Sequence, residues 1–439
     1  MPTPEVLSDQ VRRRLDGIGG ADVVVGIPCF QNEHTIGGVI TAVEAGLRKH
    51  FPDLRSVICV SDGGSRDRTR EVAQETEVGD RAEELLIPVD TPAPEKLVFE
   101  YRGTAGKGSA VRSIFEAAGS LGVRACAILD ADLRSITPTW LDRLLAPVLH
   151  HGFGFVAPVY SRHKHDGTIT NSLAYPVTTA LYGQRIRQPI GGEFGFSGDL
   201  ARHLATQDVW DTEVARFGID IWMTTTAVVE GHRACQAILG AKLHDPKDPG
   251  KDLGPMFRQV VGSLFALAGR YQGRWIQVRE VETPPTFGFR AAFSAEPVTV
   301  SIPRLTWKFV DGYVRHHQLW RRILSEGAMA GVDRAVGQAS DSGAGIVLDD
   351  ELWFAIVYDY LVAYNAREVE PGPLLDSLIP LYFARTATFV ERTRDDTPEE
   401  AEARIERGVD VAVERKPYLV ERWAALGVPA RPLRDQPVP

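Results

Sequence analysis

The regular alternation of short apolar runs with helical patterns in the first half of the chain is the feature that most constrains its fold. The expected strands span 21–30, 55–62, 84–88, 97–101 and 124–132. The expected helices between them span 34–50 and 65–75, and a third begins at Gly106. Apolar runs of strand length separated by helices are typical of a mostly parallel sheet that is covered by helices on both faces. We therefore predict an α/β, Rossmann-like fold.

The second half of the chain continues this pattern and then becomes mainly helical. Further helices are expected at 138–149, 219–231 and 252–271, and further strands at 153–160 and 233–243. After a loop at 284–297 that is rich in proline, glycine and aromatic residues, helices are expected at 303–325, 350–365, 371–390 and 397–426. We place a domain boundary near residue 290, with the α/β domain at 1–290 and a helical C-terminal region at 291–439. Helices packed onto the first domain, rather than standing free, are equally consistent with the pattern.

Composition excludes several kinds of partner. The charges of the 439 residues sum to 49 − 58 = −9 and are spread along the chain, so no basic stripe is offered to a nucleic acid. The beginning of the chain lacks the apolar core of a signal peptide, and no run reaches the ~18 apolar residues of a membrane-spanning helix. We expect a cytoplasmic protein with no membrane partner. The widely separated Cys29, Cys59, Cys126 and Cys235 favour buried reduced thiols over disulfides or a zinc site.

The strongest chemical signal is the pair of carboxylates in Asp130-Ala131-Asp132, which follows the apolar run at 125–129. In open parallel sheets, ligands gather outside the carboxyl ends of the strands. Two carboxylates with one small residue between them can hold a divalent cation against a diphosphate through hard oxygen ligands. Such triplets are common in solvated loops, but a position after a strand in an alternating α/β pattern favours a metal site.

Polar residues also follow other predicted strands. Pro28, Phe30 and Asn32 lie where the first strand gives way to a helix, and free backbone N–H groups there can seat a base and ribose. Asp62 ends the second strand before two glycines that permit a tight turn, which leaves its carboxylate to contact a nucleotide. Lys107 begins a helix and can offer its ammonium, with the N-terminal amides, to a phosphate. The alternatives are structural: a helix cap or a solvated turn.

Taken together, the segments PCFQNE, SDGGSRD, GKGSA, DADL, QPIGGEFGF and KLHDPK resemble, in order and spacing, glycosyltransferase family 81, the glucosyl-3-phosphoglycerate and glucosylglycerate synthases. The resemblance covers roughly residues 22–265 and does not extend clearly through the C-terminal helices. It implies a GT-A fold, a retaining reaction, a nucleoside-diphosphate sugar as donor and a divalent metal cofactor, Mg²⁺ or Mn²⁺. It also implies that Asp132 and His244 are the metal ligands, although a lone histidine is by itself more often structural.

The same resemblance assigns residues to the donor. The nucleotide-sugar site is expected to comprise Pro28, Phe30, Asn32, Asp62, Lys107, Asp130, Ala131 and Gly192. Glu193 lies in the stretch that resembles the surroundings of the transferred sugar, and it can hydrogen-bond sugar hydroxyls or, alternatively, cap the following helix. Asp220 can orient the acceptor hydroxyl or stabilise the oxocarbenium-like centre. Glu193 and Asp220 are therefore the expected catalytic residues.

The expected acceptor site contains one departure from the family pattern. Its residues are Thr168, Ile169, Thr170, Lys242 and Lys247. Related phosphoglycerate enzymes carry Gly-Arg-Val-Thr where this chain has Gly-Thr-Ile-Thr, so Thr168 replaces the arginine that would meet an acceptor phosphate. The change removes both a charge and a bidentate fork. We favour D-glycerate as acceptor, forming glucosylglycerate, and 3-phosphoglycerate is the alternative because basic residues lie nearby.

Other functions fit part of the pattern. A sugar nucleotidyltransferase also uses a parallel sheet and paired carboxylates, but it would carry a glycine-rich, arginine-containing loop after its first strand. A sugar-nucleotide sensor without activity would share most of these residues. The donor base, guanine or uracil, and the hexose, glucose or mannose, depend on contacts of a few atoms. We expect a homodimer, with the helical region as its interface.

Overall fold

The computed structural model describes residues 5–77, 92–243, 253–289, 298–340, 346–367 and 369–425. The chain divides into two compact units. The first contains Met1–Ser161, Ile186–Pro246 and Pro284–Ser294, and the second contains Arg162–Arg185, Lys247–Thr283 and Ala295–Pro439. This division differs from the predicted boundary near residue 290, because two inner segments of the chain cluster with the C-terminal helices.

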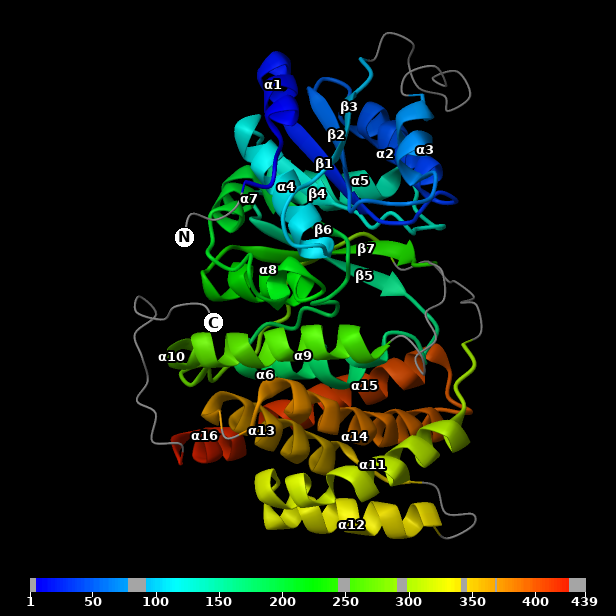
Figure 1. The fold of residues 1–439 in the computed structure, drawn as a ribbon, viewed down its shortest axis with the longest axis vertical. Coiled ribbons are helices and arrows are strands. Elements are labelled where there is room, and N and C mark those ends of the chain that lie inside the picture. Colours follow the sequence, from blue (N-terminus) through cyan, green and yellow to red (C-terminus); the bar gives the residue numbers. More distant parts are fainter. Residues whose placement is uncertain are drawn as a thin grey trace. The chain divides into compact units, whose positions relative to one another are not determined.

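Within its described residues, the first unit is built on one eight-stranded sheet (Figure 1). The strands are β1 (Val23–Cys29), β2 (Ser56–Asp62), β3 (Glu95–Glu100), β4 (Ala125–Ile128), β5 (Phe155–Ser161), β6 (Phe194–Ser197), β7 (Ala234–Ala241) and β8 (Thr286–Phe287). They lie in the order β3-β2-β1-β4-β6-β5-β7-β8. All neighbours are parallel except β6, which runs antiparallel to β4 and β5. The predicted mostly parallel α/β sheet is therefore confirmed.

Helices cover both faces of this sheet (Figure 1). They are α1 (Asp9–Ile18), α2 (Ile36–His50), α3 (Thr69–Glu75), α4 (Lys107–Ser120), α5 (Thr139–His151), α7 (Gly198–Ala205) and α8 (Ile219–Val229), with a 3₁₀ turn, η2 (Glu213–Ala215). Val23, Val25 and Ile27 of β1 share a core with α2 and α5 on one face. On the other face α4 approaches so closely that a Cβ on Gly26 would lie 2.3 Å from Ile114. The period-two alternation along β1 thus sends its side chains into two helical layers.

Among its described residues, the second unit consists of helices and their connections, with one isolated β-bridge between Gln184 and Glu282. Its helices are the π-helix η1 (Thr170–Ala174), α6 (Tyr175–Tyr182), α9 (Leu253–Arg270), α10 (Gln272–Trp275), α11 (Ile302–Ile323), α12 (Glu326–Ser340), α13 (Asp350–Ala366), α14 (Pro371–Arg392), α15 (Pro398–Glu414) and α16 (Lys416–Ala424). α6 packs on α15, where Tyr175 contacts Ile405 and Val409. α11 and α14 lie so close that a Cβ on Gly312 would be 2.2 Å from Pro380.

Most predicted elements are present within a few residues of their expected bounds. The helix predicted over 397–426 is two helices, α15 and α16, because Pro417 lacks the N–H of a helix interior and occupies the first turn of α16. The strand predicted at 84–88 lies outside the described residues. β6 was not predicted, since a four-residue run interrupted by Gly195 carries little strand signal.

The structure bears on the predictions about the cysteines and about membrane-spanning segments. All four cysteines are buried and unpaired, as predicted, and burial raises the pKa of the Cys59 and Cys235 thiols to about 12. Among the described helices, none combines the length and apolarity needed to cross a lipid bilayer.

Candidate functional site

Five charged side chains from separate parts of the first unit converge beyond the carboxyl end of β4. Asp130 follows β4 by two residues, with its Oδ1 2.8 Å from Lys107 Nζ and its Oδ2 3.2 Å from Lys242 Nζ. Lys107 begins α4 and also lies 3.2 Å from Asp220 in the first turn of α8. Lys242, just after β7, donates to both carboxylate oxygens of Glu193 at 2.8 Å. We call these five residues the charge network.

The charge network alternates in sign and is largely removed from solvent. Along the series Asp220, Lys107, Asp130, Lys242 and Glu193, each ammonium lies between two carboxyl groups. Glu193 has an exposed side-chain fraction of 0% and Lys242 of 5%, whereas Lys107 has 16% and Asp130 has 23%. A ligand therefore meets Lys107 and Asp130 first.

Two glycines explain how α8 reaches the beginning of α4. A Cβ on Gly106 would lie 2.5 Å from the Ala215 carbonyl oxygen, and one on Gly108 would lie 1.9 Å from the Val214 carbonyl oxygen. The Gly108 N–H donates to the carbonyl oxygen of Arg216 at 3.1 Å. The prediction of free amides for a phosphate is therefore wrong for Gly108, because this N–H instead holds the segment that leads into α8.

The backbone around Asp130 is fixed by close contacts. Gly192 has a φ of +94°, which few other residues adopt, and a Cβ there would lie 2.2 Å from Asp130 Oδ2. The carbonyl oxygen of Ala131 accepts a hydrogen bond from Thr35 Oγ1 at 2.7 Å. In this structure the predicted donor residues Gly192 and Ala131 make room for the Asp130 carboxylate and anchor its loop.

The charge network has three carboxyl groups but only two ammonium groups. Burial raises the pKa of Glu193 well above its ordinary value despite Lys242, and burial also raises the pKa of Asp220. Burial would raise the pKa of Asp130 as well, but Lys107 and Lys242 hold it well below its ordinary value. Burial opposes the charge of Lys107, yet Asp130 and Asp220 raise its pKa. As pH falls, Glu193 and Asp220 therefore take up a proton before Asp130 does.

Asp132, the second carboxylate of the triplet, stands apart from the charge network. It is half-buried, and it makes no hydrogen bond or ion pair with any residue in the described ranges. A free carboxylate at a strand end is the kind of hard oxygen ligand that Mg²⁺ and Mn²⁺ take. The described residues contain no ready-made group of three or more metal-binding side chains, and the predicted second ligand, His244, lies outside them.

Four of the predicted nucleotide residues lie at the adjacent ends of β1 and β2, where Cys29 pairs in register with Asp62. They are Pro28, Phe30, Asn32 and Asp62. Pro28 lies inside β1, and Phe30 follows the strand with 55% of its surface exposed. The Asn32 side-chain oxygen accepts the Phe30 N–H at 2.8 Å and so fixes this turn. Of these residues, Phe30 presents the largest exposed surface.

Asp62, in contrast to the prediction, is not free to contact a nucleotide. It is fully buried, and its Oδ2 accepts the backbone N–H groups of Gly64 and Ser65, both at 3.1 Å. Its Oδ1 accepts the Ser65 hydroxyl at 2.5 Å, and Arg70 Nη2 lies 3.5 Å from Oδ2. The carboxylate builds the turn after β2, which is the structural role that aspartate often has beside glycine.

The predicted acceptor residues belong to different units. Residues 168–170 lead into η1 of the second unit, where the Thr168 hydroxyl is hydrogen-bonded to the Tyr382 hydroxyl. Lys242, the other predicted acceptor residue among those described, belongs to the first unit and is engaged in the charge network. Lys247 lies outside the described residues.

Tyr160 is a site residue that the sequence prediction missed. It lies near the end of β5, its hydroxyl contacts Glu193 Oε2, and the same hydroxyl is 3.2 Å from the carbonyl oxygen of Gly191. Lys242 Nζ lies 5.2 Å from the centre of the Tyr160 ring. A signal was available, because Tyr160 ends a predicted strand and the strand-end rule that indicated Asp130 applies to it equally.

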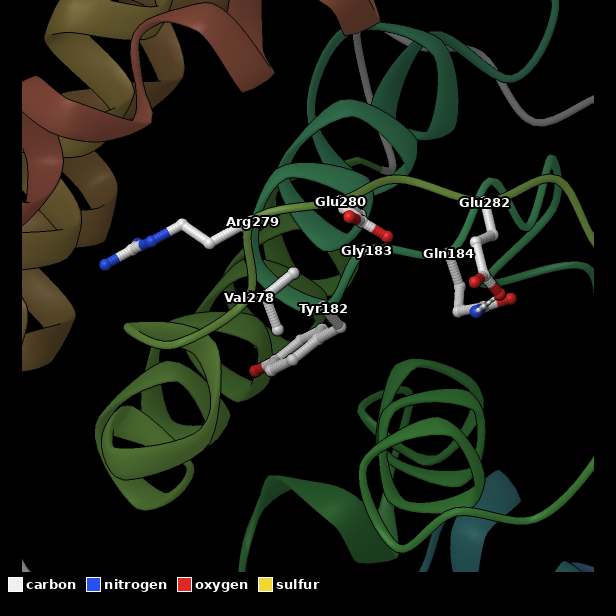
Figure 2. A pocket seen from close by; sticks show the side chains of 7 residues that line it. All are labelled: Tyr182, Gly183, Gln184, Val278, Arg279, Glu280 and Glu282. Atoms are coloured by element: carbon white, nitrogen blue, oxygen red, sulfur yellow. Dashed lines mark hydrogen bonds between the residues drawn. The ribbon is translucent and has the colours of Figure 1, made fainter.

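A separate open pocket of about 350 Å³ lies in the second unit (Figure 2). It is lined by Tyr182, Gly183, Gln184, Val278, Arg279, Glu280 and Glu282. Gln184 Nε2 donates to Glu282 Oε2 at 3.3 Å across one side of it. Its lining includes none of the predicted site residues, so the pocket is distinct from the charge network.

A comparison with known protein families matches a large part of the first unit. Residues 24–198, which include Lys107, Asp130 and Glu193, match the model of glycosyl transferase family 2. This segment of the chain is therefore similar to glycosyl transferase family 2, and the helix-flanked sheet is of the GT-A type. No curated protein matches the chain.

Several solved structures are similar to the chain at low identity. Glucosyl-3-phosphoglycerate synthase from Mycobacterium tuberculosis, in complex with Mn²⁺ and UDP-glucose, is 20% identical over 60% of this chain and 84% of that chain, with a TM-score of 0.40. A mycobacterial protein is 22% identical over 59% of this chain and 78% of its own, also with a TM-score of 0.40. The M. tuberculosis synthase with Mn²⁺, UDP and phosphoglyceric acid is 21% identical over 61% and 84%, with a TM-score of 0.39. Because these TM-scores are below 0.5, the function proposed below rests on the family match and the site.

Proposed function

We propose that the chain is a retaining, metal-dependent hexosyltransferase that moves glucose from GDP- or UDP-glucose to D-glycerate and forms glucosylglycerate. The observation that carries the proposal is the charge network, in which an ionised Asp130 lies between two lysines and buried carboxyl groups flank them. The family 2 match supports the class of reaction.

Lys107 is the proposed partner of the leaving diphosphate. An ammonium has three N–H donors, and among the described residues Asp130 and Asp220 occupy two of them, which leaves one for a phosphate oxygen. Its position at the start of α4 adds the positive end of the helix dipole. Neighbouring carboxylates keep this ammonium charged, which suits a group that stabilises a leaving anion.

Asp132 is the proposed metal ligand, with His244 as the second. Both oxygens of Asp130 contact lysines, whereas Asp132 has no partner among the described residues, and this supports Asp132 as the ligand of the pair. A cation bound there would offset the negative charge that develops on the leaving diphosphate.

Glu193 and Asp220 are the proposed contacts to the sugar and the acceptor. Oδ1 of Asp220 is buried and lies 3.2 Å from Lys107 Nζ without hydrogen-bond geometry, so it has no hydrogen-bond partner in the described part of the chain. Buried acceptors are rarely left unpaired, and an acceptor hydroxyl would satisfy this oxygen. The hydroxyl would attack on the face of the leaving group and pass its proton to a diphosphate oxygen, which requires no covalent nucleophile.

Glycerate is preferred over 3-phosphoglycerate because of Thr168. This residue brings no charge, and its hydroxyl is already hydrogen-bonded to Tyr382. A phosphate dianion would need an arginine fork or a free ammonium. Lys242 is not such a group, since it is 5% exposed and paired with carboxylates. 3-Phosphoglycerate is the second candidate, with Lys247 as its proposed contact.

The test combines GDP-glucose, UDP-glucose and GDP-mannose with glycerate and 3-phosphoglycerate, each with Mg²⁺, Mn²⁺ or a chelator. We expect glucosylglycerate and free nucleoside diphosphate, and no product with chelator. Release of pyrophosphate from a nucleoside triphosphate and a sugar phosphate would instead identify a nucleotidyltransferase. Binding of the donor without any turnover would identify a sensor.

A further inference from the structure

The pairing of β5 with β7 changes register at Tyr160. Val159 lies opposite Ile238, but Tyr160 lies opposite Gly240, so β7 has one extra residue at this point. Gly240 has a φ of +87°, which residues with a side chain rarely adopt. A bulge of this kind re-aims the side chains that follow it, and bulges are common beside active sites. Here the bulge lies two residues before Lys242 and directly opposite Tyr160.

Tyr160 and Lys242 together enclose the Glu193 carboxyl group. The Tyr160 hydroxyl contacts Glu193 Oε2, and Lys242 Nζ lies 2.8 Å from both carboxyl oxygens. Both side chains also reach the same backbone atom, since the Gly191 carbonyl oxygen is 3.2 Å from the Tyr160 hydroxyl and 2.8 Å from Lys242 Nζ. These four polar groups therefore contact one another directly.

The hydroxyl of Tyr160 has one proton and, among the described residues, contacts two acceptor groups. When Glu193 is ionised, the hydroxyl donates to Glu193 Oε2. When Glu193 carries a proton, Glu193 donates to the Tyr160 oxygen, and the Tyr160 hydroxyl donates to the Gly191 carbonyl oxygen. Both arrangements use the same heavy-atom positions, because a phenol both donates and accepts.

Each charged group that faces Glu193 pairs well with only one of the two protonation states of its carboxyl group. They are Lys242 after β7, Asp130 after β4 and Lys107 on α4. An ammonium only donates and an ionised carboxylate only accepts, so each of them suits one protonation state of Glu193 better than the other. The Tyr160 hydroxyl, which both donates and accepts, suits either state.

We propose that Tyr160 is a positioning residue, whose hydroxyl holds the Glu193 carboxyl group in one orientation towards the donor sugar in both protonation states. This inference rests on the proposed function, in which Glu193 contacts the transferred sugar. Tyr160 acts through Glu193, and its hydroxyl is not required for the nucleotide or the metal to bind.

The experiment compares Tyr160→Phe with Tyr358→Phe in the full chain. Tyr160→Phe removes the hydroxyl and leaves the ring beside Lys242. Tyr358 is a matched control, because its buried hydroxyl also donates to a backbone carbonyl oxygen, that of Ala412, at 2.5 Å and outside the charge network. Steady-state turnover is measured with glucose donor and glycerate, together with calorimetric binding of the bare nucleoside diphosphate and thermal unfolding.

We expect Tyr160→Phe to lower kcat about 10- to 100-fold, the effect of losing one hydrogen bond to a charged group, with donor KM within about threefold. Binding of the bare nucleoside diphosphate should equal that of the wild type, which shows that the site is folded. Tyr358→Phe should lower the unfolding midpoint and leave kcat unchanged.

The outcomes separate two failures. If the wild-type protein transfers sugar and Tyr160→Phe keeps wild-type kcat, or loses no more than Tyr358→Phe does, the positioning role is overturned and the proposed function stands. If the wild type transfers no sugar in any donor and acceptor combination, the proposed function fails, and the role of Tyr160 in it fails too.

Discussion

Two buried polar clusters in this molecule both combine carboxyl groups with cationic side chains. They differ in the ratio of negative to positive groups and in whether every acceptor has a hydrogen-bond partner. In the second unit, Asp359 is fully buried, and Oδ1 accepts the Tyr418 hydroxyl at 2.6 Å and Arg422 Nε at 2.9 Å. Its Oδ2 accepts the backbone N–H of Ser325 at 2.7 Å. One carboxylate thus meets one guanidinium and two neutral donors. We call these four residues the Asp359 cluster.

The charge network of the first unit has no such balance. Three carboxyl groups share two ammonium groups, and Oδ1 of Asp220 has no hydrogen-bond partner among the described residues. A balanced, fully bonded cluster is what a structural role requires, since breaking it leaves an uncompensated buried charge. A cluster with more carboxyl than ammonium groups, and with an acceptor that lacks a hydrogen-bond partner among the described residues, is instead suited to bind a ligand. Substitutions at single residues can test this difference.

The largest effect on turnover is expected for substitution of Asp132, the second carboxylate of the triplet. Asp132→Ala should lower turnover about 1000-fold, because a ligand of the charge-stabilising cation is lost. The free energy of unfolding should change by less than about 0.5 kcal/mol, since the side chain is half-buried without a partner in the described residues. Asp208→Ala, which removes an exposed carboxylate of the same unit, is the control for turnover. Wild-type activity of Asp132→Ala would refute the metal assignment.

Asp359→Asn tests the balanced cluster, and its effect should fall on stability. We expect a loss of about 3 kcal/mol in the free energy of unfolding, since Arg422 loses its partner and an amide replaces a three-donor acceptor. Urea unfolding measures the loss. The turnover of the folded fraction should match that of the wild type, and a stable variant with poor turnover would reverse the contrast between the clusters.

Glu193→Gln is expected to make the protein more stable at neutral pH while turnover falls. Because the folded-state pKa of Glu193 lies above its ordinary 4.5, the folded state binds more protons, and stability declines as pH rises from the ordinary value towards the folded one. Glutamine removes this decline, which is worth ~1.4 kcal/mol for each unit of pKa shift. Unfolding measured at pH 7 and pH 4 should show a gain at pH 7 that shrinks at pH 4. A loss at pH 7 would mean that pairing with Lys242 outweighs burial.

Gly240→Ala should have the smallest effect. No atom of the described residues lies within 4 Å of a Cβ at this position, so the expected cost is that of the φ of +87°, about 1 kcal/mol in the free energy of unfolding. If the bulge orients Lys242, kcat should fall more than this cost explains. Gly231→Ala, at a φ of +83° with equal space, is the matched control and should leave kcat unchanged.

Much of the fold was predictable because its signal is local. Apolar runs of strand length between helices predicted the parallel sheet, and the strand-end rule led to Asp130 and should have led to Tyr160. The role of Asp62 could not be predicted in this way. Whether its carboxylate accepts the N–H groups of the following turn or is free to bind a ligand depends on the backbone geometry of that turn, and the same sequence is compatible with both.

The pairings of the charge network could not be predicted from local pattern. Lys107 and Asp220 are 113 positions apart, and their contact depends on the close approach of Gly106 and Gly108 to the segment before α8. A glycine near a helix start is equally consistent with a turn, a cap or a close contact. Only the three-dimensional packing decides between them.

The interleaved path of the chain has a consequence for how this protein can be divided. Residues 162–185 and 253–283 find their packing partners among the C-terminal helices, as Tyr175 does with Ile405 and Val409. A stop codon after residue 290 would leave α6 and α9 without α15 and α14 and expose their apolar faces to aggregation. The C-terminal helices therefore cannot be removed or exchanged as one continuous segment. A recombination that exchanges the helical unit between proteins would have to exchange the two inner segments as well.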